Sequence, residues 1–454
     1  MNKIYAILTI IVLFSFLIRV YKIDSSPPSL TWDEAAVGYN AWTIANYGRD
    51  EYGNILPIYF RSFGEDKQPI HIYITAFFVK MFGLSEFSTR IPSALFGTLN
   101  VLLIFFLSRV LFNYKVGLLS SLFLAISPQN IHFSRFNHEA NFALFFFMLG
   151  MFLFFHSIRA KKIFLPISLL MFMLSMLSYH AAEIAVPPIL FLLGILYSRQ
   201  ISKNKQILIV LTLIIGSFLL LFIIQPKLFG VSRLNQTTLG KNDIEKTPAF
   251  KITQNSLLGR INLALVQYSW HFDPKFLFIQ GDKNARLSSQ TGEFHAIDLL
   301  LVILGICYLL YKRSKTSLII LTWFLIGPFP ASVVGEAPHA ARAMFMMGSW
   351  QIISAVGFSK LIDLVKKPIL KVLVIMICLV ILSISLSNYL KYYYGEFSKR
   401  YAIDWQYGMK QIIEYVKNHQ EYNQVNTTAI RSQPYIFYLY YLKTPLPDYL
   451  NSVI

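Results

Sequence analysis

Residues 369–390 read ILKVLVIMICLVILSISLSNYL, an apolar run that contains one charged side chain, Lys371. A helix needs about 20 apolar residues to cross the roughly 30 Å of hydrocarbon in a bilayer, so this run can span a membrane. The stretch from Ile4 to Val20 has the same character. Over all 454 residues the chain is 55% hydrophobic and only 14% charged. Soluble domains carry about 25% charge, so the bilayer is the solvent of this chain.

The whole sequence predicts an all-α polytopic membrane protein with about eleven spanning helices. The first is expected to be retained, because its apolar stretch exceeds a signal-peptide core and lacks a small-x-small cleavage site. The predicted spans lie near residues 4–21, 91–111, 116–130, 140–158, 163–180, 184–198, 206–224, 296–311, 317–334, 342–360 and 369–390.

Charge predicts the orientation. Cytoplasmic turns of membrane proteins are rich in Lys and Arg. If the N-terminus is inside, Asp363 is the one acidic residue of 23 on the cytoplasmic side. We therefore expect a multi-pass protein of the cytoplasmic (plasma) membrane with its C-terminus outside, and no nucleic acid as a partner despite the net charge of +18. The basic residues of the short inside turns are Arg109, Lys115, Arg159, Lys161, Lys162, Arg199, Lys203, Lys205, Lys312, Arg313, Lys315, Lys366 and Lys367.

Two long external loops belong to the predicted membrane domain, residues 1–390. The first loop covers about 21–90 and the large loop about 225–295. Within the first loop, the spacing predicts a helix over Thr31–Tyr47 that stops at Gly48. Ile70–Phe82 is too short to cross the bilayer and is expected to be an interfacial helix.

The tail, residues 391–454, is expected to form a small external cap. A helix is predicted over Ala402–Asn418, a strand-like run over Val425–Arg431, and an aromatic cluster over Tyr435–Tyr441. This mixture predicts an α/β-like segment on the outer surface.

Four polar constellations could carry chemistry. The first is Thr31-Trp32-Asp33-Glu34. It fits a helix capping box, in which Thr31 caps and Glu34 reaches back. It also fits a general base, Asp33, that deprotonates an acceptor hydroxyl, and the two readings are compatible.

The second and third constellations carry basic groups. Gly64-Glu65-Asp66-Lys67-Gln68-Pro69 follows Arg61 and reads either as a solvated turn or as a site where Lys67 offsets the charge of a lipid phosphate. Ala337-Pro338-His339-Ala340-Ala341-Arg342 reads either as a headgroup anchor or as a second phosphate contact.

The fourth constellation, residues 134–141, holds Arg135 and Glu139 at the outer end of the third span, where they could pair with each other or position a substrate. His180 with Glu183 is similar, and there a structural hydrogen bond is favoured. Metal-ligand spacing and Gly-rich phosphate loops are lacking, so no metal site and no cofactor are expected, and metal dependence is left open.

With these residues, the chain resembles membrane glycosyltransferases of family 39, which include protein O-mannosyltransferases and aminoarabinose transferases. The likeness covers roughly residues 28–160 and continues in the later part of the chain. It rests on Asp33-Glu34, Asp66-Lys67-x-Pro69, residues 82–87, Arg90-Ile91-Pro92-Ser93-Ala94-Leu95, Ser127-Pro128, Phe133-Ser134-Arg135, Pro338-His339-Ala340-Ala341-Arg342 and Trp405-Gln406-Tyr407-Gly408.

The resemblance implies a GT-C fold and an inverting hexosyl or pentosyl transferase. Its donor would be a polyprenyl-phosphate-linked sugar, and its acceptor a hydroxyl of the cell envelope on the outer face of the membrane. Asp33 would be the base, with Glu34 positioning acceptor or sugar. Lys67, Arg342 and His339 would contact the donor phosphate. The expected substrate-positioning residues are Arg61, Asp66, Arg135, Glu139 and His180.

Two alternatives stay open. A lipid-linked-sugar transporter would show repeat-related broken helices with ionisable groups at the bilayer midplane, whereas here the ionisable groups border the spans. A GT-C oligosaccharide transferase or polymerase would differ in pocket size, which the sequence does not give.

Overall fold

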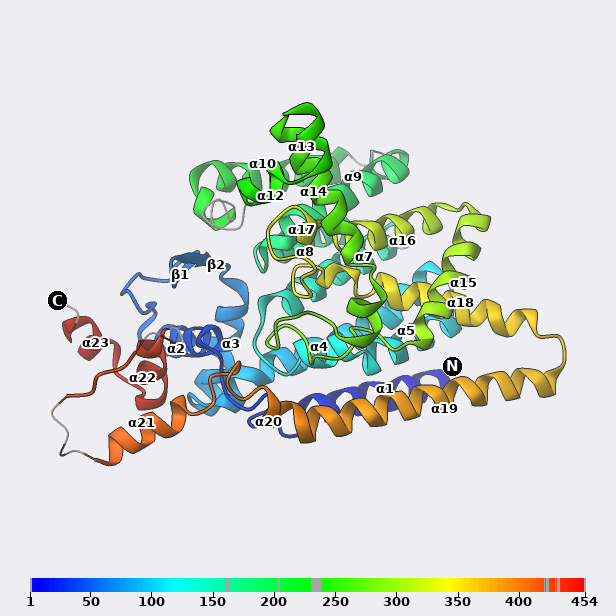
Figure 1. Ribbon diagram of the computed structural model, residues 1–454. Helices are drawn as coiled ribbons and strands as arrows, with labels where there is room; N and C mark the ends of the chain where they lie inside the picture. The colour runs from blue at the N-terminus through cyan, green and yellow to red at the C-terminus, as the bar shows by residue number, and fades with distance from the viewer. Residues whose placement is uncertain are drawn as a thin grey trace.

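A computed structural model describes residues 2–159, 163–202, 205–229, 239–419, 421, 424–428, 430 and 433–452. Helices dominate it, and the described strands form a single two-stranded sheet. Figure 1 shows the long helices gathered in one bundle. The first-loop elements α2, α3, β1 and β2 and the tail helices α21–α23 lie together at one end of it. The prediction that these two regions share one side of the membrane domain agrees with this arrangement.

Each predicted span contains a helix. Five helices are long and apolar enough to cross a membrane among the residues that the structure describes: Lys3–Val20, Glu86–Leu111, Glu139–Arg159, His180–Ile201 and Pro368–Arg400. Most of the other bundle helices are shorter, so the exact number of spans stays a prediction. The bundle helices are α1 (Asn2–Val20), α4 (Glu86–Leu111), α5 (Tyr114–Ile126), α6 (Pro128–Phe133), α7 (Glu139–Arg159), α8 (Phe164–Met176), α9 (His180–Ile201), α10 (Lys205–Ile224), α15 (Ile297–Lys312), α16 (Lys315–Ile326), α17 (Phe329–Ser332), α18 (Ser349–Leu364) and α19 (Pro368–Tyr392).

Three predicted spans are broken. The span near 317–334 divides at residues 327–328, between α16 and α17. The span near 116–130 divides at Ser127, which ends α5, because Pro128 starts a new helix at its first position. The span near 342–360 becomes an α-helix only at Ser349, and Met344–Met346 forms a 3-10 turn, η3. The indole of Trp323 donates to the carbonyl of Phe345 at 2.8 Å, which satisfies a backbone group that a longer helix would have paired.

The bundle core lies where α4, α5, α7, α8, α15 and α18 pack together. Helices α15 and α18 approach closely at two glycines. A Cβ on Gly357 would lie 1.9 Å from the carbonyl oxygen of Leu301, and one on Gly305 would lie 2.2 Å from that of Ile353. Small residues at such crossings let helix backbones touch within a membrane.

The first loop folds as its turn chemistry predicts. Helix α2 (Trp32–Tyr47) begins with the predicted capping box and ends at Gly48, whose φ is 64°. Strands β1 (Phe60–Ser62) and β2 (Glu65–Lys67) pair antiparallel through a two-residue turn, Phe63-Gly64, with positive φ at both residues. Helix α3 spans Ile70–Phe82, as expected.

The large loop is mostly helical up to Ile279 in its described parts, and residues 280–296 form turns and irregular backbone. Its elements are η1 (Pro226–Phe229), α12 (Lys241–Glu245), α13 (Pro248–Thr253), α14 (Ser256–Trp270) and η2 (Lys275–Ile279). Lys161, Lys162 and Lys203 of the predicted cytoplasmic turns lie outside the described residues.

The tail corrects the predicted cap. After η4 (Tyr393–Phe397) and α20 (Ser398–Arg400), turns occupy residues 401–408. Helix α21 therefore starts at Met409, later than predicted, and spans Met409–Asn418. In the predicted strand, residues 424–428 have irregular backbone, while 429 and 431 lie outside the described residues. The tail closes with α22 (Pro434–Leu442) and α23 (Leu446–Ser452).

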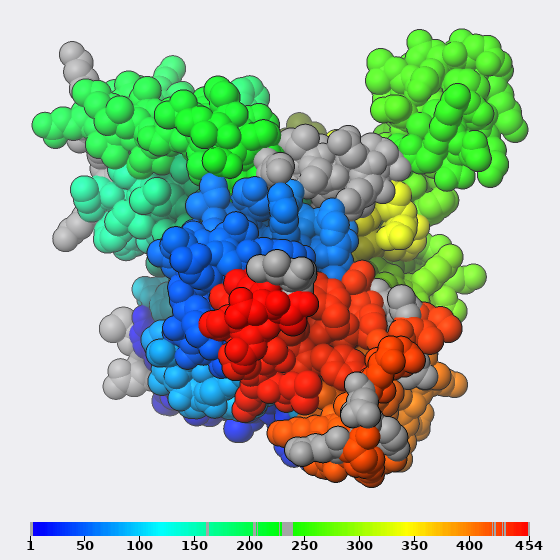
Figure 2. All heavy atoms as spheres, turned by 90° about the vertical axis from the view of Figure 1, so that its left-hand side faces the viewer, coloured from blue at the N-terminus to red at the C-terminus, as the bar shows by residue number. Residues whose placement is uncertain are grey.

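The tail also packs into the first loop rather than standing apart from it. Ile436, Phe437 and Tyr440 of α22 share a buried cluster with Ala35 and Tyr39 of α2. Figure 2 shows this end of the molecule, with the first loop in blue against the tail in red. One hydrophobic cluster therefore joins the two segments, and the division at residue 390 stays a prediction.

Candidate active site

The site begins at the N-terminus of α2. Thr31 caps the helix by accepting a hydrogen bond from the backbone N–H of Glu34, which places Asp33 in the first turn. The Asp33 side chain is 47% exposed and lies 2.5 Å from Nζ of Lys67, whose side chain is only 10% exposed. Lys67 is the last residue of the β1–β2 hairpin, so the hairpin places the Lys67 ammonium next to the Asp33 carboxylate.

Glu34 occupies the opposite environment. Its carboxylate is fully buried and paired with Arg90, which donates from Nε at 2.8 Å and from Nη2 at 3.0 Å. It also accepts from the backbone N–H groups of Thr31 and Asn137. The buried Glu34 carboxylate lies outside the cavity wall, which favours a structural role, and its substrate-positioning role stays a prediction.

A polar cavity of about 400 Å³ surrounds Asp33. Five predicted site residues line it, although they come from segments far apart in the sequence: Asp33, Lys67, Glu139, His339 and Arg342. The wall also includes Trp32, Phe63, Glu65, His138, Tyr179, Arg286 and Glu336. Carboxylates and cations thus face one another across a single chamber.

The segment that carries His339 and Arg342 is held in place by hydrogen bonds. Arg342 donates from Nη1 to the carbonyl of Gly335 at 2.7 Å. The N–H of His339 donates to Nε2 of His271 at 3.1 Å, and that of Ala340 donates to the Asp282 carboxylate at 2.8 Å. These bonds fix the backbone, so both basic side chains meet the cavity in a defined position.

Arg286 is a cavity residue that the sequence interpretation missed. Its guanidinium carbon lies 4.0 Å from the ring centroid of Trp32, the residue before Asp33. Burial lowers the pKa of Arg286, and the nearby Asp33 carboxylate opposes that effect. Arg286 lies in an irregular part of the large loop with no periodicity around it, so no local pattern singled it out.

Besides Glu34, four predicted site residues lie outside the cavity wall: Arg61, Asp66, Arg135 and His180. Arg135 is fully buried and donates to the carbonyls of Ile18 and Tyr21, which fastens the end of α1, and its positioning role stays a prediction. Arg61 is exposed on β1. The ring of His180 bonds Glu183 and approaches the carbonyl of Asp66, which ties α9 to the hairpin.

No group of three His, Cys, Asp or Glu side chains in the described part of the chain is arranged to hold a metal ion. The cavity instead offers a carboxylate that can accept a proton and several cations that can hold an anion. This combination suits the transfer of a group away from a phosphate.

Residues 66–224 match the family model described as dolichyl-phosphate-mannose-protein mannosyltransferase. No curated protein sequence matches the chain. Among solved structures, ArnT from Cupriavidus metallidurans bound to undecaprenyl phosphate is 12% identical, with a TM-score of 0.59 over 98% of this chain and 87% of its own. The apo oligosaccharyltransferase of Archaeoglobus fulgidus is 14% identical, with a TM-score of 0.56 over 94% of this chain. This chain has the GT-C fold.

Within the GT-C chain, the family match starts at Asp66, and so it contains Lys67 and Glu139 but neither Asp33 nor Arg342. The chain spans 60% of the length of the archaeal oligosaccharyltransferase. Most of the residues that line the cavity therefore lie outside the family match.

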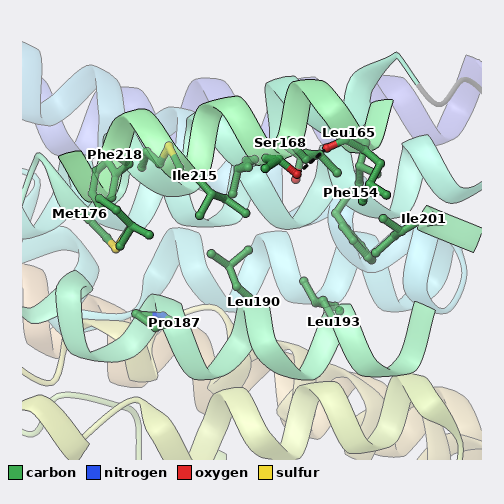
Figure 3. A pocket seen from close by; sticks show the side chains of 17 residues that line it. Phe154, Leu165, Ser168, Met176, Pro187, Leu190, Leu193, Ile201, Ile215 and Phe218 are labelled. Carbon is green, nitrogen blue, oxygen red and sulfur yellow. Dashed lines mark hydrogen bonds between the residues drawn. The ribbon is translucent and has the colours of Figure 1, made fainter. Parts of the chain in front are cut away.

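An apolar groove of about 510 Å³ runs between α8, α9 and α10 of this GT-C fold. Figure 3 shows Met176, Pro187, Leu190, Leu193 and Phe218 among the side chains around it. The lining hydroxyls of Ser168 and Thr212 donate to backbone carbonyls, so they do not make the groove polar. Such a surface accepts hydrocarbon.

Proposed function

We propose that the protein is a membrane glycosyltransferase that moves a sugar from a polyprenyl phosphate to a hydroxyl of the cell envelope. The observation that carries the proposal is the Asp33–Lys67 contact at 2.5 Å inside a cavity that Arg286 and Arg342 also line. A base and a set of phosphate-binding cations are thereby within one chamber.

In the proposed reaction, the Asp33 carboxylate takes the proton of the acceptor hydroxyl. The acceptor oxygen attacks the anomeric carbon as the bond from that carbon to the phosphate oxygen breaks. The electron pair leaves with the polyprenyl phosphate, whose charge Lys67, Arg342, Arg286 and His339 stabilise. A single displacement inverts the configuration of the sugar.

Both lipid-bound relatives support the choice of donor. ArnT was solved with undecaprenyl phosphate, and the Archaeoglobus fulgidus enzyme AglB with dolichol-phosphate and an inhibitory peptide. In this chain, Met176 lines the apolar groove and Tyr179 lines the polar cavity. The Cα atoms of residues 176 and 179 lie at most about 11 Å apart. A phosphate in the cavity is therefore close enough for its prenyl chain to reach the groove.

A direct transfer assay tests the proposal. Purified protein in liposomes is incubated with radiolabelled polyprenyl-phosphate hexoses and pentoses, a membrane extract as acceptor, and a chelator. We expect label to move from the lipid to an extract component, with an inverted anomeric centre by NMR, and without a metal or other cofactor. Label that stays on every lipid contradicts the proposal. In a parallel reaction with diphosphate-linked oligosaccharides as donors, transfer from these donors alone would instead indicate an oligosaccharide transferase.

The proposed orientation has its own test. Single cysteines at the exposed residues Asn54 and Lys312, in a chain with its two native cysteines replaced, are treated with a membrane-impermeant thiol reagent on intact cells. Labelling at 54 but not at 312 supports a site on the outer face of the plasma membrane. The reverse pattern contradicts it.

A further inference from the structure

The turn at residues 401–408 touches the candidate site through Gln406. This side chain is 2% exposed, and its Oε1 accepts a hydrogen bond of 2.7 Å from the backbone N–H of Trp32. Trp32 is the first residue of α2, where backbone N–H groups have no partner within the helix. Gln406 therefore supplies a cap from the tail, one residue before Asp33.

The preceding residue, Trp405, reaches the opposite wall. Its ring is fully buried, and its Nε1 donates to the carbonyl of Ala285 at 3.1 Å. Next to it, the carbonyl of Arg286 lies 3.0 Å from Nε2 of His132. The backbone that carries the Arg286 guanidinium is thus held from two sides.

Two adjacent tail residues consequently contact the two segments that meet at the Trp32–Arg286 stack. The contact of Gln406 fixes the start of α2, which carries the candidate base Asp33. The contact of Trp405 fixes the loop that carries Arg286, a candidate phosphate-binding cation. Both segments come from distant parts of the chain, and the described contacts through residues 405 and 406 join them.

We propose that Trp405 and Gln406 are positioning residues that fix the distance between the Asp33 carboxylate and the Arg286 guanidinium. The proposal rests on the proposed function and deepens it, because it makes the tail part of the transferase site. A misplacement of about 1 Å can cost on the order of 100-fold in rate, so a small shift in either wall has a large effect.

Two variants remove one hydrogen bond each. Gln406→Met keeps the length of the side chain, and Trp405→Phe keeps an aromatic ring of smaller size. Gln406→Met lacks the acceptor for Trp32, and Trp405→Phe lacks the donor for Ala285. Matched controls are Gln411→Met on the exposed face of α21 and Trp270→Phe on α14, where the indole is 41% exposed. Gln406→Glu keeps an acceptor oxygen and serves as the conservative rescue.

Amide hydrogen exchange of the whole chain measures how firmly the two segments are held, without relying on activity. We expect faster exchange in residues 31–35 for Gln406→Met and in residues 284–288 for Trp405→Phe, with the spanning helices and both control variants unchanged. Unaltered exchange in both segments overturns the proposal, whatever substrate the protein uses. If the wild type transfers no sugar at all, the proposed function fails, while exchange still decides whether 405 and 406 hold the two walls.

Kinetics then separate positioning from general support of the fold. Gln406→Met should lower kcat roughly 10- to 100-fold with little change in donor KM, and Gln406→Glu should recover part of the loss. In an Asp33→Asn background, Gln406→Met should cause no further loss, because the base that it positions is gone. An equal loss in both backgrounds, or normal kcat despite faster exchange, contradicts positioning for catalysis.

Discussion

Asp33 and Glu34 are adjacent acids at the start of one helix, yet they lie in opposite environments. Asp33 faces the cavity half-exposed beside Lys67, whereas Glu34 is buried with Arg90. Successive residues on an α-helix point in directions about 100° apart, so one turn can direct one acid to solvent and its neighbour to the interior. The motif therefore combines a chemical group, Asp33, with the structural pair Glu34–Arg90 that anchors it.

The largest effect is expected from Asp33→Asn, which keeps the size of the side chain but cannot accept a proton. Transfer of radiolabelled sugar should fall about 10²- to 10⁴-fold, while thermal unfolding and donor binding stay close to wild type. Asp24→Asn, at an exposed position of the same loop, is the matched control. Near-normal transfer by folded Asp33→Asn would exclude Asp33 as the base and direct attention to Glu139.

Arg90→Met breaks the buried partner pair and leaves the Glu34 carboxylate uncompensated. Removing one partner of such a pair costs about 3 to 5 kcal/mol of stability. Thermal unfolding in detergent should show the loss. Adding Glu34→Gln to Arg90→Met should restore part of it, since the unpaired charge disappears. An Arg90→Met protein as stable as wild type would contradict the structural assignment of Glu34.

Lys67→Ala and Arg342→Ala test the cation side of the cavity. Each should weaken binding of polyprenyl phosphate by about 1.5 to 3 kcal/mol, the usual range for a lost charged hydrogen bond. Calorimetric titration measures the change, and Lys80→Ala, an exposed lysine of the same loop, provides the control. If both variants bind donor normally, these residues anchor headgroups instead.

The smallest effect is expected from Thr31→Ala, which removes the side-chain cap of α2. Stability should fall by about 1 kcal/mol. Transfer should change far less than in Asp33→Asn, because Gln406 still holds the helix start. A rate loss as large as that of Asp33→Asn would mean that the cap itself controls the chemistry.

Local chemistry predicted the first loop well. The capping box at Thr31, the stop at Gly48 and the helix Ile70–Phe82 all depend on neighbouring residues, and the structure confirms them. The apolar spans were also recognisable as helices. Their breaks at Ser127 and before Ser349 depend on partners such as Trp323, which sequence periodicity does not reveal.

The candidate site was harder to predict because distant segments build it. Asp33, Lys67 and Arg342 carry charges next to recognisable motifs, so sequence found them. Arg286 has no such motif, and its place over Trp32 follows only from tertiary packing. Conversely, Arg135 was predicted to be functional because it is a charged residue at the end of a span, but its guanidinium donates hydrogen bonds to backbone carbonyls of α1.

The union of first loop and tail has a consequence for how the protein is made. Tyr39 donates from its hydroxyl to the carbonyl of Thr444, a partner 405 residues later in the chain. Ribosomes add about 5 to 20 residues per second, so roughly 20 to 80 seconds separate the synthesis of the two segments. During that interval the apolar face of α2 that packs against α22 is uncovered, and this end of the molecule is complete only when the last helices have been synthesised.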